Sequence, residues 1–314
     1  MFLPRIFLPN VILAVLLAAC GGEERPLLVP AETAQVVAGA GDVDAGAVAR
    51  VADVVARELP LLRRQLGLAR VERFFVHVHE SRSAMPESLV AGLHEDAAGF
   101  AMLGSHQVHI VWGEVQRLAV RLSGVVRHEL VHELLDQLVA PQGRYLPRWF
   151  HEGLAQLLAG DTYLSASEDD LVWRLAAGNL PPFGSLERRF PETRFELRSA
   201  YAQSYSYVAW LERNYGLPLL LRTARNTDER TSFGRSLVAQ TGRSSLQLQD
   251  AWRDYVLYGS GASWRVLREN WFGLSMILVL PVLVLALIRR LRREERARRV
   301  LEQRARQAQE VDEA

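Results

Sequence analysis

The 314-residue chain contains no lysine, so all 37 of its basic residues are arginine. This bias points to the base composition of a genome rather than to a functional surface, and we draw no function from it. The single cysteine excludes an intrachain disulfide and any zinc site built from several cysteines. A metal site in this chain must therefore use histidines and carboxylates. The net charge is +1 and 49% of the residues are hydrophobic, values that exclude a disordered chain.

The N-terminal segment has the pattern of an export signal. Arg5 precedes an apolar stretch that ends at Cys20, the only cysteine of the chain. This pattern resembles a bacterial lipoprotein signal, in which cleavage just before the cysteine leaves a lipidated N-terminus. We therefore predict a lipoprotein-type signal peptide at 1–19 and a linker at 20–43. The alternatives are an uncleaved signal anchor or ordinary signal cleavage.

A second apolar segment lies near the other end of the chain. Residues 271–288 form an uncharged run of 18 residues, which as a helix would cover about 27 Å of hydrocarbon. This run predicts a transmembrane helix. The segment 289–314 carries nine arginines against six acidic residues, and the positive-inside rule places such a tail in the cytoplasm. We therefore predict a protein of the bacterial cytoplasmic membrane with its body facing the periplasm or the exterior, contacting lipid through this helix and through a lipidated Cys20.

The charge of the remaining body bears on its partners. Residues 21–288 hold 27 basic and 30 acidic residues. A nucleic-acid-binding protein needs a basic surface to neutralise phosphates. The sequence therefore argues against a nucleic-acid partner.

The order of predicted elements indicates an α+β domain over 44–262. Apolar residues recur at helical spacing over 44–66, and alternation predicts strands at 71–79 and 108–112, with another around 99–103. Helices dominate from about residue 118 onward. We expect a small N-terminal mixed sheet, a helix that bears the active site and a helical C-terminal subdomain, followed by the transmembrane helix. Two subdomains around a cleft would give the same order of elements.

A His-Glu-Leu-Val-His sequence carries the chemistry of this domain. His128 and His132 are four residues apart in a helical segment, so their imidazoles share one face and can bind one Zn²⁺ ion. Glu129 is next to His128 in the sequence, so its side chain leaves the helix on a different face from the two imidazoles. That position suits a carboxylate that deprotonates the water used to hydrolyse an amide.

Glu152, twenty residues beyond His132, is the candidate third ligand. The intervening residues leave room for the first helix to end, for a loop to reverse the chain and for a second helix to begin after Pro147. An antiparallel second helix would bring the carboxylate back to the paired imidazoles. Three protein ligands with one open position are typical of catalytic rather than structural zinc sites.

His128, Glu129 and His132, together with Glu152 in a Glu-Gly-Leu-Ala sequence, resemble the gluzincin metallopeptidases, in particular the bacterial peptidase MA-like domains. The resemblance covers about residues 70–258 and is strongest at these motifs. It implies a zincin-like fold, Zn²⁺ bound by the two histidines and Glu152, and Glu129 as base and proton shuttle. It also implies that a strand at 106–112 is the sheet edge on which an extended peptide pairs.

This chain differs from the family pattern at one position, and the sequence does not identify the donor that stabilises the oxyanion. Gluzincins of the thermolysin type place an aspartate four residues after the ligand glutamate, where this chain has Gln156. The amide oxygen can still accept a hydrogen bond from a ligand histidine, but it carries no charge. For the donor that stabilises the oxyanion, Tyr201 and Tyr205 on one helix face are the candidates and Tyr145 is the third. Each tyrosine is at least as well explained as a buried aromatic.

The other histidines favour plainer roles. His77, His79, His106 and His109 lie on predicted strands without a partner at ligand spacing, which favours surface or substrate-groove positions over metal sites. His151 precedes Glu152 on a different helix face, which argues against a ligand. Asp136, one turn after His132, is either a partner of a ligand histidine or a solvated neighbour.

Three functional hypotheses follow from these features. The first is a membrane-tethered zinc peptidase that hydrolyses peptide bonds of peptide or protein substrates outside the cytoplasm. The second is a zinc-site fold used as a non-catalytic interaction or chaperone-like module in envelope assembly. An intramembrane protease is disfavoured because Arg127 and Glu133 flank the motif on a helix of polar character.

Overall fold

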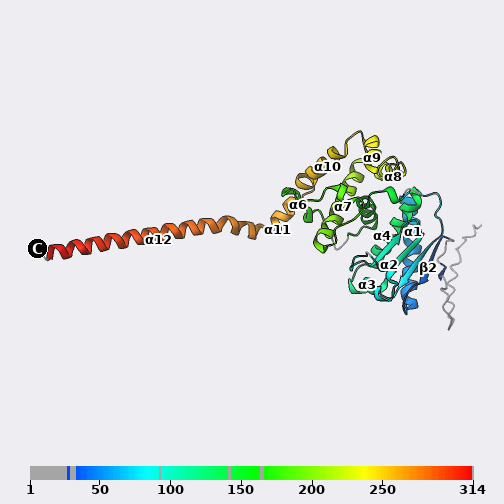
Figure 1. Ribbon diagram of the computed structural model, residues 1–314, viewed down its shortest axis with the longest axis horizontal. Coiled ribbons are helices and arrows are strands. Elements are labelled where there is room, and N and C mark those ends of the chain that lie inside the picture. The colour runs from blue at the N-terminus through cyan, green and yellow to red at the C-terminus, as the bar shows by residue number, and fades with distance from the viewer. Residues whose placement is uncertain (1–26, 29–32, 92, 141–142, 163–165, 313–314) are drawn as a thin grey trace, which may run out of the picture.

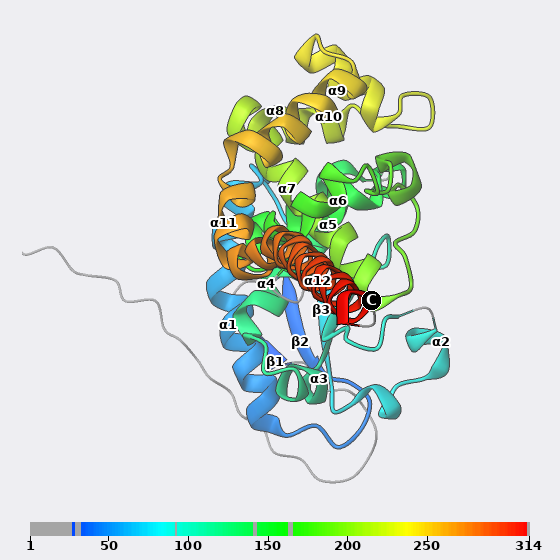
Figure 2. The same ribbon diagram turned by 90° about the vertical axis from the view of Figure 1, so that its left-hand side faces the viewer.

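The structure is a computed structural model that describes residues 27–28, 33–91, 93–140, 143–162 and 166–312. The predicted signal peptide at 1–19 and Cys20 lie outside the described residues. A mixed sheet and its covering helices form the first part of the body, and a helical bundle forms the second (Figures 1 and 2). The predicted α+β architecture is therefore confirmed.

Five strands form the sheet, in the order β1-β2-β3-β5-β4. Their bounds are Leu27–Leu28 for β1, Ala34–Ala38 for β2, Phe74–His79 for β3, Gly99–Met102 for β4 and Gln107–Val111 for β5. The three central strands β2, β3 and β5 are parallel, whereas β1 and β4 run antiparallel at the two edges. Strands β1 and β2 lie in the range 20–43, where the sequence predicts a linker.

The position of β5 corrects one expectation about the substrate. The family resemblance implies that the strand at 106–112 is the sheet edge, but β5 lies between β3 and β4. A tight turn at 103–106 folds β4 back onto the outer side of β5, which makes β4 the edge strand next to the candidate site. Strand order could not be deduced from periodicity, because alternation shows which residues are buried and not which strand lies outside.

Two helices cover one face of this sheet: α1, Ala45–Gln65, and α4, Leu122–Val139. Asp44 caps α1 by accepting a hydrogen bond from the backbone N–H of Gly46. Alternate strand residues and one stripe of each helix form the buried core between them, including Val36, Val76, Val108, Ile110, Val55, Leu62, Val126 and Leu130. Two short helices lie in connections: α2, Glu87–Val90, between β3 and β4, and α3, Trp112–Arg117, between β5 and α4.

The second half is helical, as predicted. It comprises α5 Arg148–Ala159, α6 Asp169–Ala176, α7 Arg194–Tyr215, α8 Leu217–Arg225, α9 Phe233–Thr241, α10 Ser245–Asp254 and α11 Ala262–Glu269. An aromatic cluster holds it together, in which Trp149 of α5 contacts Phe183, Tyr207 and Phe233. Helix α5 contacts both α4 and α7 and so joins the two halves.

The C-terminal helix α12 runs from Trp271 to Asp312 and projects from the rest of the chain (Figure 1). Among the helices that the structure describes, none is both long enough and apolar enough to traverse a lipid bilayer. This finding contradicts the predicted transmembrane helix at 271–288, together with the membrane localisation and the cytoplasmic tail at 289–314 that were inferred from it. The apolar run is one part of a 42-residue helix that continues through the arginine-rich segment and is polar on average.

Candidate metal centre

Helix α4 presents His128 and His132 side by side. The stripe of α4 that includes Leu130 and Leu134 is fully buried in the core, which fixes the rotation of the helix. The two histidines, one turn apart, therefore project together, and their Nε2 atoms lie 3.2 Å from each other. The i, i+4 spacing in the sequence predicts this pairing, and the structure places the two imidazoles as predicted.

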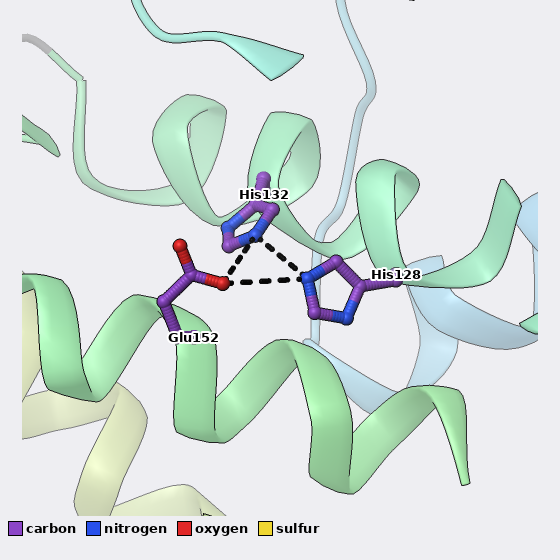
Figure 3. A group of neighbouring side chains, drawn as sticks. All are labelled: His128, His132 and Glu152. Carbon is purple, nitrogen blue, oxygen red and sulfur yellow. Dashed lines mark hydrogen bonds and ion pairs between the residues drawn. The ribbon is translucent and has the colours of Figure 1, made fainter. Parts of the chain in front are cut away.

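Helix α5 returns the chain so that Glu152 faces the two imidazoles (Figure 3). After a short 3₁₀ turn at Gly143–Tyr145, the chain enters α5 at Arg148, directly after Pro147. The Oε2 atom of Glu152 lies 3.5 Å from Nε2 of His128 and 3.6 Å from Nε2 of His132. The three predicted ligand atoms therefore converge.

The spacing of the three ligand atoms is close to what a zinc ion requires. Ligand atoms about 2.0–2.1 Å from one tetrahedral ion are about 3.3 Å from one another. The three separations observed here, 3.2, 3.5 and 3.6 Å, are close to that value. Among the described residues, His128, His132 and Glu152 form the one group of three or more side chains with the composition and proximity of a metal site. The donor set and its geometry therefore fit Zn²⁺.

Burial and mutual charge shift the pKa values within this cluster. Burial alone would raise the pKa of Glu152, but hydrogen bonds and positive charge from His128 and His132 hold that pKa well below its ordinary value. Burial alone would lower the pKa of His128, but the hydrogen bond to Glu152 and the charge of Glu129 outweigh it and raise the pKa. The carboxylate of Glu152 and the imidazole of His128 therefore favour each other's charged forms.

Glu129 lies beside the cluster without belonging to it. Its side chain is buried, and burial raises the pKa of its carboxyl group against the lowering effect of the two histidines. Edge strand β4 passes directly over it, because Gly99 has no side chain: a Cβ at this position would lie 2.9 Å from Cγ of Glu129. The carboxylate of Glu129 is therefore close both to the candidate metal ligands and to the sheet edge.

The helix that carries Glu152 is locked against α7. A Cβ at Gly153 would overlap the backbone carbonyl oxygen of Ser204, so only glycine permits this close approach. The fully buried Gln156 donates from Nε2 to the carbonyl oxygens of Glu152 and Tyr201. Gln156 thus joins α5 to α7, a role that the sequence did not reveal.

The structure shows the burial or the contacts of the three tyrosines that are candidate oxyanion donors. Tyr201 and Tyr205 are both half-buried on α7, and the ring of Tyr201 packs edge-on against Phe190 at 5.1 Å. The hydroxyl of Tyr145 accepts a hydrogen bond from Arg144, 2.8 Å away. A catalytic role for any of the three stays a prediction.

Three of the strand histidines have specific buried partners. His79 and His109 are only 3% and 2% exposed, which contradicts the expected surface or groove positions. Nδ1 of His79 accepts from the backbone N–H of Ala40, and its Nε2 lies 2.9 Å from Nδ1 of His109. His106, in the β4–β5 turn, bonds to Glu133. These contacts join segments far apart in sequence, which is why spacing did not reveal them.

The two polar neighbours of the ligands have structural contacts. His151 is buried and its Nε2 bonds to the carbonyl oxygen of Gly143 at 3.3 Å, which leaves it outside the ligand cluster as expected. Asp136 is also buried, and its Oδ2 accepts from the backbone N–H of Gly104 at 2.6 Å. Asp136 therefore holds the β4–β5 turn.

This chain has a match among solved structures and none among family models or curated proteins. No family model matches the sequence. No curated protein matches it either. Among solved structures, the chain is similar to a mutant of the M1 zinc metallopeptidase from Deinococcus radiodurans, with 14% sequence identity and a TM-score of 0.39. The match covers 75% of this chain and 52% of that chain, so this protein spans about half the length of its structural neighbour.

Proposed function

We propose that this protein is a zinc-dependent peptidase of the gluzincin type, with His128, His132 and Glu152 as metal ligands and Glu129 as general base. The observation that carries the proposal is the convergence of the three ligand atoms, at 3.2, 3.5 and 3.6 Å from one another. Two imidazoles and one carboxylate leave a fourth position open, which is the arrangement of catalytic zinc sites.

Each residue then has a defined part in peptide hydrolysis. A bound zinc ion supplies a Lewis acid that polarises the scissile carbonyl and lowers the pKa of water. Glu129 accepts the proton of the attacking water at its carboxylate and delivers it to the leaving amine nitrogen. The burial of Glu129 next to the ligands keeps bulk water from competing for that proton.

The edge strand β4 supports a peptide as the substrate. Its outer side has no partner strand within the described sheet, and an extended peptide can add to such an edge through backbone hydrogen bonds. Because Gly99 of β4 lies against Glu129, a peptide paired with β4 would pass beside the general base. Tyr201 and Tyr205 are the candidates for the donor that stabilises the oxyanion.

Metal analysis combined with cleavage of a peptide library by the full-length chain tests the proposal. We expect bound zinc and hydrolysis that a chelator abolishes. E129Q should keep its metal and lose about 10²- to 10⁴-fold in turnover, the range for a general base. E87Q, at an exposed glutamate of α2, is the matched control and should behave as wild type.

Two outcomes would contradict the proposal. Wild-type turnover in E129Q would exclude Glu129 as the base. Metal binding without hydrolysis of any library peptide would favour the alternative, a zinc-site fold used as an interaction module.

A further inference from the structure

The two carboxylate oxygens of Glu152 have different partners. Oε2 faces the imidazoles of His128 and His132 at 3.5 and 3.6 Å. Oε1 faces Nε of Arg148, 3.4 Å away. Arg148 and Glu152 are four residues apart on α5 and therefore share one face of that helix. The carboxylate is thus held between the candidate metal position and a guanidinium group.

The guanidinium of Arg148 is positioned by other parts of the fold. Its carbon Cζ lies over the ring of Phe190, 5.0 Å from the ring centroid. Phe190 is buried and packs against Tyr201. The backbone N–H of Arg148 donates to the carbonyl oxygen of Glu187 at 2.7 Å, which anchors the first residue of α5. A cation over an aromatic face is attracted to it, so Phe190 helps to hold the guanidinium of Arg148 beside the carboxylate.

We infer that Arg148 is a positioning residue that retains Oε1 of Glu152, so that the carboxylate binds the metal through Oε2 alone. The inference rests on the proposed function of the site. A carboxylate can donate one or both oxygens to a metal ion, and a second oxygen would take the position that the attacking water needs. The positive charge of the guanidinium, 3.4 Å away, competes for that oxygen. The open position then depends on Arg148 as well as on the three ligands.

The burial of the carboxylate decides whether this ion pair is strong enough to matter. Exposed ion pairs contribute little, because water solvates both partners. The side chain of Arg148 is 43% exposed, but that of Glu152 is only 11% exposed. The Glu152 side chain as a whole is therefore little exposed to water, and the guanidinium and the metal are the main alternatives for its second oxygen. Removal of the guanidinium therefore directs Oε1 to the metal rather than to solvent.

Cobalt substitution tests this inference without depending on activity. The full-length chain is stripped of metal, loaded with Co²⁺, and its visible absorption is recorded, because the bands of four-coordinate Co²⁺ are more intense than those of five-coordinate Co²⁺. We expect R148A and R148Q to lose band intensity relative to wild type. R148K, which keeps a cation at the same spacing, should retain the intense bands. Turnover of the zinc-loaded R148A protein should fall about 10- to 100-fold.

The chain offers a matched control for this pair. Arg290 and Glu294 of α12 form a second Arg–Glu pair at i, i+4 spacing, with Nε and Oε1 3.0 Å apart and both side chains exposed. R290A should leave the Co²⁺ bands and turnover unchanged.

The results separate this inference from the proposed function. Wild-type bands in both R148A and R148Q would overturn the role of Arg148 and leave the metal site intact. Loss of Co²⁺ binding in these variants, with circular dichroism unchanged, would overturn it too, because a released carboxylate should bind through more oxygens and not fewer. Failure of the wild-type protein to bind Co²⁺ would instead overturn the proposed function and the inference together.

Discussion

Glu133, the residue directly after the second histidine of the metal motif, is fully buried and pairs with His106 in the β4–β5 turn. Its Oε1 lies 2.8 Å from Nδ1 of His106 and also accepts from the side chain of Gln137. Asp136, on the same helix, accepts from the backbone N–H of Gly104 in that turn. Helix α4 thus supplies the candidate metal ligands and also fixes the turn that ends the edge strand.

Removal of the His106 imidazole should destabilise the protein through Glu133. In H106A the Oε1 atom of Glu133 loses one of its two hydrogen bonds and keeps the one from Gln137, and a hydrogen bond to a charged group contributes about 1.5–3 kcal/mol. Denaturant unfolding of metal-free protein measures the loss. The control is E72A, because Glu72 contacts the same imidazole at 3.7 Å but is 71% exposed, and it should cost less than about 1 kcal/mol. Equal losses in H106A and E72A would contradict the role of Glu133.

Gly153 should not tolerate a side chain. A Cβ at this position would overlap the carbonyl oxygen of Ser204 and lie 2.6 Å from Cγ2 of Val208. Overpacking of a core costs about 1–3 kcal/mol, which exceeds the gain of up to about 1 kcal/mol from the helix propensity of alanine. We therefore expect a lower melting temperature and weaker metal binding in G153A, measured by thermal unfolding and metal titration.

Gly184 provides the control for this substitution, since a Cβ there meets no atom within 4 Å. G184A should melt within a degree or two of wild type, as surface substitutions usually change stability by less than about 0.5 kcal/mol. A stable G153A protein would show that α5 and α7 can separate without cost, and that Gly153 does not hold Glu152 in place.

The candidate site was predictable because its residues lie close together in the sequence. His128 and His132 share one helix by their spacing, and a single helix-loop-helix brings Glu152 to them within 25 residues of chain. The parts that support the site were not predictable, because their partners are remote. Glu133 pairs with His106 and Gly153 contacts Ser204, and neither pair shares an element.

The fold shows the same division. Helical periodicity identified α1 and α4, and alternation identified β3 and β5. Strand β2 lies in a segment without clear periodicity, and its place beside β3 depends on tertiary pairing. The order of β4 and β5 also depends on how the turn at 103–106 folds. The composition of residues 271–288 alone does not show that they belong to a helix that extends to Asp312.

The pair of buried strand histidines predicts a loss of stability in mild acid. Burial, with the nearby charge of His77, lowers the pKa of His79 to about 4 and that of His109 to about 3. In the unfolded chain histidine titrates near its ordinary pKa of about 6.5. Below about pH 6.5 the unfolded state therefore binds protons that the folded state does not bind. The contribution of these histidines to the free energy of unfolding is fully present above about pH 6.5 and decreases as the pH falls toward the folded pKa values.

Each such histidine contributes a slope of up to about 1.4 kcal/mol per pH unit in this window. Urea unfolding of metal-free protein between about pH 7.5 and about pH 5 measures it. H109F keeps an aromatic ring between His77 and Phe100, which stack on His109 at 5.0 and 4.5 Å, but removes one titrating group. The slope of unfolding free energy against pH should be smaller in H109F by up to about 1.4 kcal/mol per pH unit, the contribution of one histidine. This holds even if the stability of H109F at neutral pH is lower. An unchanged slope would show that His109 is protonated in the folded state.

The contact between Gly99 and Glu129 links the edge strand to catalysis. A Cβ at Gly99 would lie 2.9 Å from Cγ of Glu129 and 3.1 Å from the carbonyl oxygen of His109. The carbonyl belongs to the sheet and cannot move freely, so the Glu129 side chain must shift. Misplacement of a catalytic group by about 1 Å can cost about 10²-fold in rate. G99A should therefore keep its metal and lose turnover to about that extent, measured as kcat on a cleaved library peptide.

Met102 of the same strand offers the comparison that isolates this effect. Gly99 faces α4, whereas Met102 shares the opposite face of the sheet with Phe100, which stacks on His109. M102A changes β4 without touching Glu129, so its kcat should stay near that of wild type. Comparable losses in both variants would assign the effect to the strand as a whole. A loss confined to G99A, with zinc content unchanged, would show that the sheet edge sets the position of the general base.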